Sequence, residues 1–405
     1  MPFVIIVLAL GTFAIGTDGY LVAGLLPNIA SDMKVTVGVA GQLVTLFAIT
    51  YAFGSPLLST LTANVGRKRV LLGAMMLFTL ANLASTLVPS AFWLFGTRIL
   101  AALGASLYTP TAMATATQLV DGKQRGRALA TVIAGSTGAL VLGLPLGSWI
   151  GTLFGWRTSF GMVALIGAGS TLLLAILLPQ VEHVRGAITW RDRLTLLSKR
   201  HVLLVLGLTF VSLVGANSIL TYVMPILQRL TTFKAEMLSV ALFGIGVASF
   251  VGNLLGGYLA DRWGISRTLL RVYGSLVVIT FGFSLLMFFH KSTILNVTVI
   301  VVFVLWGIIS WLGAPALNGY LASLEPQSTT VALSLNVTAL YLGVAGAGSV
   351  GGLVLTLGGV TYMGLVCGLI EVLALVLALF CIRAGNAVGK FSERRETHVS
   401  FKSFR

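Results

Sequence analysis

The chain has 405 residues, of which 57% are hydrophobic and only 9% are charged, whereas about a quarter of the residues in soluble domains are charged. This composition excludes an ordinary soluble protein and predicts an all-α membrane protein that crosses the bilayer many times. The formal net charge of +15 would indicate nucleic-acid binding in a soluble protein, so its meaning depends on where the basic residues lie.

Apolar runs of about 20 residues recur along the chain, and each is long enough to cross a bilayer as a helix. The runs are continuous, unlike the alternating segments of about ten residues that form outer-membrane barrels. We therefore predict twelve transmembrane helices and no sizeable soluble domain. The predicted helices are 3–27, 39–61, 70–88, 92–117, 127–152, 158–178, 202–227, 237–260, 268–289, 294–322, 328–355 and 359–382.

A long polar stretch separates the first six predicted helices from the last six. Both sets carry a proline in their fourth helix, Pro110 and Pro315. Two pseudo-symmetric halves of this kind are one architecture of secondary transporters, with the substrate path between them. The predicted parts are a six-helix bundle over 1–179, a cytoplasmic linker over 180–201, a second six-helix bundle over 202–383 and a basic cytoplasmic tail over 384–405.

The basic residues lie mostly on one side of the membrane if successive loops are assigned to alternate sides. Of the 26 Lys and Arg residues, twenty then fall on the side of the two termini. Cytoplasmic loops carry such an excess, so both termini are predicted to be cytoplasmic. The positive charge therefore indicates topology and contact with anionic membrane lipids, and no nucleic-acid partner is expected.

An aspartate lies in the middle of the first predicted helix, in the sequence FAIGTDGYLVAGLLP. An ionised carboxylate at the centre of a lipid-embedded helix costs roughly 2.5–3.5 kcal/mol. Arg98 lies six residues inside the fourth predicted helix, at a similar depth to Asp18, so the two side chains can pair. A buried carboxyl beside a cation is suited to exchanging a proton. We predict that Asp18 and Arg98 form the proton-coupling site; a tether that only fixes helix packing is the alternative.

The last predicted helix contains a second membrane acid, Glu371. We interpret it as a neutral, internally hydrogen-bonded or packing residue, and coupling to protons is the alternative. In the fifth predicted helix, Gly143, Pro145 and Gly147 form the sequence GLPLG. Small residues allow helices to approach closely, and proline removes a backbone hydrogen bond. This helix is predicted either to bend and seal against the second half or to make ordinary small-residue packing.

Amide and aromatic side chains lie inside several predicted helices, and they suit a flat, mostly uncharged ligand. Aromatic residues near helix ends have an alternative role in the belts at the membrane surface. The candidate substrate-cavity residues are Tyr20, Gln42, Tyr51, Tyr108, Asn217, Tyr222, Trp311, Asn318, Asn336 and Tyr341.

Several motifs carry a resemblance to the major facilitator superfamily. The loop GGYLADRWG, residues 256–264, fits the G-x-x-x-D-R-x-G signature that the family places between helices two and three and again between helices eight and nine. The first-half counterpart STLTANVGRKR, residues 59–69, keeps its glycine and basic cluster but has Ala63 at the position of the acid. RILAALG, residues 98–104, and GLPLG resemble the arginine and glycine-proline motifs of the proton-driven antiporters.

The chain thus resembles the twelve-helix drug:proton antiporters, with bacterial purine-efflux permeases nearest and arabinose-type and chloramphenicol-resistance exporters close behind. In those exporters helices one and four line one cavity, and an acid more often stands one position after Asp18, where this chain has Gly19. The resemblance implies gating by the two signature loops. The gating candidates are Gly66, Arg67, Lys68, Arg69, Asp261, Arg262 and Gly264.

The implied function is secondary active transport in a bacterial cell membrane, with purine-like metabolites or drugs such as chloramphenicol exported in exchange for protons by alternating access. The sequence has no nucleotide-binding loop, no metal-spaced His and Cys, and no soluble-type catalytic constellation. An enzyme, a cofactor and a metal are therefore not expected. The expected partners are a small-molecule substrate, protons and lipids around a monomer; an intramembrane lipid-modifying enzyme and a passive channel are the alternatives.

Overall fold

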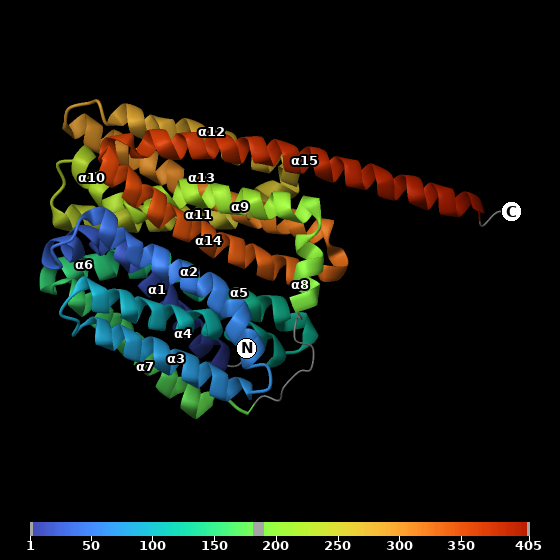
Figure 1. Cartoon of the computed structure of the whole chain (residues 1–405), viewed down its shortest axis with the longest axis horizontal. Helices are drawn as coiled ribbons and strands as arrows, with labels where there is room; N and C mark the ends of the chain where they lie inside the picture. The colour runs from blue at the N-terminus through green and yellow to red at the C-terminus, as the bar shows by residue number, and fades with distance from the viewer. Residues whose placement is uncertain (1–2, 181–189, 403–405) are drawn as a thin grey trace.

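The computed structural model describes residues 3–180 and 190–402, and all regular secondary structure in these ranges is helical (Figure 1). Eleven helical segments of the described chain are long and apolar enough to cross a membrane. The third predicted helix forms α3, which begins with three basic residues and is not among the eleven. It nevertheless packs in the bundle against α4 and α7. The all-helical membrane fold is confirmed, and the count of twelve spans stays a prediction.

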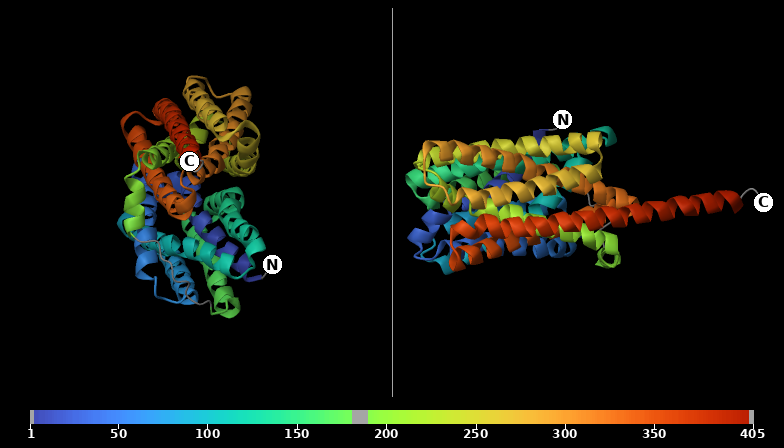
Figure 2. Two further views of the ribbon diagram at one scale, coloured as in Figure 1. Left: turned by 90° about the vertical axis from the view of Figure 1, so that its right-hand side faces the viewer. Right: turned by 90° about the horizontal axis from the view of Figure 1, so that it is seen from above.

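The first half of the fold consists of the helices from α1 to α7. These helices form one bundle, and the second half lies beside it as another (Figures 1 and 2). The first-half elements are α1 (Phe3–Asp32), α2 (Val37–Leu61), α3 (Arg67–Ser85), α4 (Ala91–Gln118), η1 (Gly122–Gln124), α5 (Arg125–Gly138), η2 (Ala139–Gly143), α6 (Leu144–Phe154) and α7 (Trp156–Leu177).

The second half consists of the helices from α9 to α15, and the short helix α8 precedes them. The elements are α8 (Trp190–Leu197), α9 (Arg200–Thr221), α10 (Val223–Leu230), α11 (Ala235–Trp263), α12 (Ile265–Leu286), α13 (Thr293–Leu324), η3 (Pro326–Ser328), α14 (Thr329–Leu357), η4 (Val360–Tyr362) and α15 (Met363–Lys402). The helix α8 lies in the predicted linker, of which residues 181–189 fall outside the described residues. The predicted tail continues α15 as far as Lys402, and residues 403–405 are not described.

Several helices differ from their predicted bounds, and prolines lie inside or near each of them. The first helix continues through Pro27 to Asp32, because one proline removes only one backbone hydrogen bond. The fifth predicted helix contains a π-helical turn, η2, immediately before α6, whose second residue is Pro145. Proline cannot donate to the carbonyl four residues earlier, and a π turn accommodates such a mismatch. The seventh predicted helix is divided at Tyr222 into α9 and α10.

Both chain ends lie towards the same end of the bundle, where α1 begins and α15 projects (Figure 1). We call this the terminal end, and the other the opposite end. Because α2 starts at the opposite end and α14 finishes there, contacts between the start of α2 and the finish of α14 join the two halves at the opposite end.

Hydrogen bonds of this α2–α14 contact use both backbone carbonyls and side chains as acceptors. The Gln42 amide donates to the Gly348 carbonyl over 3.3 Å, and the Thr45 hydroxyl donates to the Ala345 carbonyl over 3.1 Å. Thr45 also lies 3.3 Å from the Ser349 hydroxyl. A Cβ atom at Gly41 would overlap the hydroxyl of Tyr222, so a larger residue there would displace a ring that bonds to the Gly348 carbonyl. The two halves are therefore held together closely at the opposite end.

Candidate functional site

The structure places the side chains of Asp18 on α1 and Arg98 on α4 in direct contact. Arg98 Nη1 donates to Asp18 Oδ1 over 2.5 Å, and Nη2 lies 3.5 Å from the Asp18 carbonyl oxygen. Both side chains are buried, with exposed fractions of 0% for Asp18 and 1% for Arg98. Charges in such a low-dielectric setting persist only when they are paired. The pair is therefore the main electrostatic feature of the first-half interior.

Aromatic rings complete the surroundings of Arg98. The guanidinium carbon lies 4.6 Å from the centre of the Phe47 ring and 5.6 Å from that of Phe160. Asp18 Oδ2 and Arg98 Nε are buried without a hydrogen-bond partner. A tether built only for stability would satisfy these atoms, because an unpaired buried polar group is costly. The free oxygen is a position where Asp18 can take a proton while Oδ1 keeps its bond to Arg98.

The residue after Asp18 faces in a different direction. A Cβ atom built on Gly19 would meet nothing within 4 Å, whereas Asp18 is fully enclosed. Successive helical residues are rotated by about 100°, which accounts for the difference. Asp18 therefore contacts α4 of its own half, and the open space is next to Gly19.

Two aromatic pairs join the halves among the candidate cavity residues. Tyr51 of α2 stacks on Tyr341 of α14, with ring centres 3.6 Å apart and an interplanar angle of 16°. Tyr20 of α1 makes an edge contact with Trp311 of α13 at 6.4 Å. Flat rings from both halves therefore meet at the interface, and those of Tyr51 and Tyr341 cover each other.

The remaining cavity candidates form two groups. Asn336 donates to Asn318 over 2.8 Å and accepts from the Thr209 hydroxyl over 2.6 Å, which makes a polar network within the second half. Thr209 is not among the predicted cavity residues, although it shares a helix with Asn217, which is half-buried. By contrast, Tyr108 and Tyr222 are fully buried and bond to the carbonyls of Leu8 and Gly348, so they lie in helix contacts, and Gln42 lies in the α2–α14 contact.

The glycines of the fifth predicted helix pack against α1. A Cβ at Gly143 would overlap Thr17, and one at Gly147 would lie 3.1 Å from Leu21. The carbonyl of Leu140 in η2 instead lies against Gly246 of α11 in the second half. Close packing within the first half and contact with the second half therefore occur on different faces of the same segment.

The two signature loops lie at the terminal end. Gly66 precedes α3, and Gly264 separates α11 from α12 with a φ of 82°, a conformation that favours glycine. Asp261 and Arg262 are exposed, and Arg262 lies 3.4 Å from the Tyr258 hydroxyl. Within residues 3–180 and 190–402, no hydrogen bond or ion pair joins the side chain of Asp261 to another residue. The signature acid is therefore unpaired in this state. Arg67, Lys68 and Arg69 form the first turn of α3.

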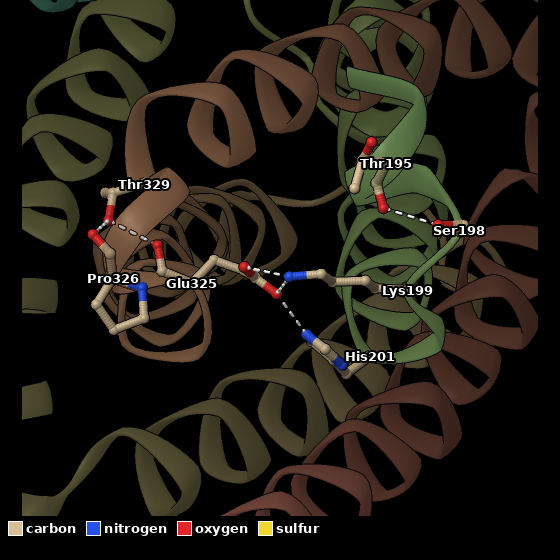
Figure 3. Close-up of polar contacts among 7 residues, drawn as sticks. All are labelled: Thr195, Ser198, Lys199, His201, Glu325, Pro326 and Thr329. Carbon is tan, nitrogen blue, oxygen red and sulfur yellow. Dashed lines mark hydrogen bonds and ion pairs between the residues drawn. The ribbon is translucent and has the colours of Figure 1, made fainter. Parts of the chain in front are cut away.

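An ion-pair cluster that the sequence analysis missed ties the start of α9 to the loop between α13 and α14 (Figure 3). Lys199 Nζ lies 2.7 and 2.8 Å from the two carboxylate oxygens of Glu325, and His201 Nε2 lies 2.8 Å from Oε1. Although burial favours the neutral acid, the hydrogen bonds and charges of Lys199 and His201 hold the pKa of Glu325 below its usual value. In the sequence, the available signal for this cluster was Glu325 itself, an acid in a loop that contains no basic residue.

Acid should weaken this cluster. Because the pKa of Glu325 is lowered in the folded protein, the cluster stabilises the fold at neutral pH, and that stabilisation is lost as the pH falls below 4.5 towards the folded-state pKa. Glu325→Gln should cost about 1 kcal/mol at pH 7, because Lys199 is partly exposed, and should reduce the difference in thermal stability between pH 7 and pH 4. An equal pH dependence in both proteins would contradict this role.

Comparison with known proteins identifies the protein family. The sequence model of the Major Facilitator Superfamily matches residues 8–347. The chain is 32% identical over 376 residues to the uncharacterized MFS-type transporter YbcL of Bacillus subtilis, covering 92% of this chain and 95% of that one. It is also 34% identical over 265 residues to a chloramphenicol resistance protein of Streptomyces lividans, covering 65% and 68%.

The crystal structure of a bacterial homolog of the human lysosomal transporter Spinster, in an inward-facing and occupied conformation, superposes with a TM-score of 0.74. That likeness, at 18% identity and 94% and 96% coverage, shows the shared fold. The chain therefore belongs to the Major Facilitator Superfamily. It is a transport protein rather than an enzyme, and it spans the bacterial plasma membrane several times.

Proposed function

We propose that this chain exports small organic molecules in exchange for protons by alternating access between its two halves. The buried contact between Asp18 and Arg98 carries the proposal, because it holds a carboxyl with one free oxygen inside the membrane. Protonation removes the carboxylate charge from Arg98 and so favours a different arrangement of α1 and α4. A proton and a substrate that each favour a different arrangement are thereby coupled.

The direction of transport follows from the predicted topology. With both termini in the cytoplasm, the terminal end is cytoplasmic and the α2–α14 contact closes the external end. The state described here is then the one that loads substrate from the cytoplasm. The unpaired Asp261 fits this assignment, since a cytoplasmic gate would form its contacts in the other state.

The substrate is proposed to be planar and neutral or weakly cationic. The half-buried ring of Tyr341 and the exposed amide of Asn318 offer stacking and hydrogen bonds, while Arg98 is already paired with Asp18. An anionic ligand would find few free partners and would lose its hydration. The resistance to chloramphenicol named for the Streptomyces relative is compatible with such a substrate class.

The proposal is tested with purified protein in vesicles under an imposed pH gradient. Accumulation of chloramphenicol or a purine analogue should follow the gradient, saturate with concentration and exceed that of a dianionic metabolite. Flux that ignores the pH gradient and does not saturate would indicate a channel. Preferential transport of the dianion would refute the proposed substrate class.

Asp261→Asn should slow turnover more than it weakens substrate binding. Among the described residues the exposed Asp261 carboxylate has no partner in this state, so its contacts are expected when the terminal end closes. The first-half signature has Ala63 at the corresponding position. Of the two signature loops, only the second therefore supplies an acid, Asp261, for closure. We expect several-fold slower transport with an unchanged binding constant, whereas full activity at equal expression would exclude an asymmetric gate. The variant Arg125→Gln, which removes an exposed arginine at the terminal-end start of α5 outside the signature loops, tests whether any charge change at this end has the same effect.

A further inference from the structure

A groove opens on the outer surface of α12, away from the interface between the halves. Its volume is about 490 Å³, and α12 lies at the edge of the bundle (Figure 1). Six residues of α12 between Leu270 and Ile279 line it, among them Arg271, Gly274 and Val278, and Ile309 of α13 completes the lining. A surface at this position in a membrane protein faces lipid.

One stripe along α12 changes from cationic to apolar. Arg267, Arg271, Gly274 and Val278 are spaced by four, three and four residues, so they share one helical face. Both arginines are exposed at the terminal end, and 72% of the area of Val278 is exposed farther along. A Cβ at Gly274 would meet nothing within 4 Å, so the groove is open between charge and apolar surface.

The cationic end of the groove is held in place and has no protein counterion. The Arg271 guanidinium lies 4.4 Å from the centre of the Trp263 ring, which orients it towards the terminal end. In the described part of the chain, neither Arg267 nor Arg271 forms an ion pair with a carboxylate. Their charges are therefore available to an anion at the level of the lipid headgroups.

We propose that this groove binds one anionic glycerophospholipid of the leaflet at the terminal end. The phosphate and its anionic headgroup pair with Arg271 and Arg267, and an acyl chain lies over Gly274 and against Val278. A zwitterionic lipid matches the apolar part equally well but lacks the net negative charge, so charge gives the preference. That this leaflet is cytoplasmic depends on the proposed topology.

Quenching of Trp263 fluorescence by lipids with brominated acyl chains tests the proposal. The full chain is placed in phosphatidylcholine vesicles that contain a minor fraction of brominated phosphatidylglycerol or of brominated phosphatidylcholine. The signal of Trp263 is the difference between the native protein and Trp263→Phe, each measured with every variant. Phosphatidylglycerol should quench more strongly, and Arg271→Gln should lower its relative binding constant about fivefold. The control Arg229→Gln removes an exposed arginine at the opposite end and should change nothing.

Further measurements distinguish binding of a lipid in the groove from general attraction of anionic lipids to the positive surface charge. Gly274→Leu places a side chain in the open groove but keeps both arginines, so it should also lower phosphatidylglycerol binding. Equal quenching by the two lipids, or an unchanged preference in Gly274→Leu, would overturn the proposal in favour of surface charge alone. Displacement by soluble glycerol phosphate would show a phosphate site rather than a lipid site. The measurement requires no transport, so its failure is distinct from failure of proton-coupled export.

Discussion

Asp18→Asn is expected to abolish export against a substrate gradient while leaving the protein folded in the membrane. Asparagine keeps an oxygen that accepts from Arg98 Nη1, but it cannot bind or release a proton. A pH difference of one unit supplies about 1.4 kcal/mol per exchanged proton, which supports about a tenfold substrate gradient. The native protein in vesicles should approach this accumulation, and the variant should only equilibrate substrate.

Stability must be measured in the same experiment, because Arg98 remains buried without a countercharge. Breaking a buried pair costs about 3–5 kcal/mol when no acceptor remains, and the asparagine oxygen should keep the cost below this range. Asp32→Asn is the matched control, since Asp32 lies on the same helix and pairs with Arg157 at the protein surface. Concentration of substrate by Asp18→Asn with native pH dependence would make Asp18 a packing residue and direct attention to Glu371.

A disulfide across the α2–α14 contact is expected to stop transport reversibly. Thr45 and Ser349 belong to different halves, and their hydroxyl oxygens lie 3.3 Å apart. Cysteines at these positions, in a background with Cys367→Ser and Cys381→Ser, should form a bond when oxidised and fix the opposite end closed. Transport should fall to background and return after reduction, because alternating access requires this contact to separate.

The matched control places the same kind of bond within one half. Ser85 on α3 and Thr97 on α4 are hydrogen-bonded at 2.7 Å, and both belong to the first half. Oxidation of cysteines at these two positions should leave transport largely intact if each half moves as a rigid body. Undiminished transport by the oxidised pair at positions 45 and 349 would show that the α2–α14 contact does not open during the cycle.

Much of the fold could be predicted because long apolar runs need little tertiary information. The depth of Asp18 and Arg98 was also accessible, since an α-helix rises about 1.5 Å per residue. The direction in which Asp18 points was not. It depends on the rotation of α1, which is set by contacts such as Thr17 with Gly143, and these join residues far apart in the sequence.

Other parts of the site depend on how separate segments meet. The stacking of Tyr51 on Tyr341 requires the relative placement of the two halves, which no local pattern encodes. The cluster of Glu325 with Lys199 and His201 links loop and helix-end residues more than 120 positions apart, where hydropathy carries no signal. Asn217 and Glu371 were recognisable as polar residues in apolar helices, but their neighbours were not.

The α2–α14 contact, which joins the two halves at the opposite end, depends on only a few residues. The main-chain acceptors of α14 are present whatever the side chain, whereas the donors of α2 are the side chains of Gln42 and Thr45. Added volume at Gly41, in contrast, would prevent closure. Substitutions that spare Gln42, Thr45 and Gly41 are therefore expected to leave the α2–α14 contact intact, whatever they change elsewhere in the interface.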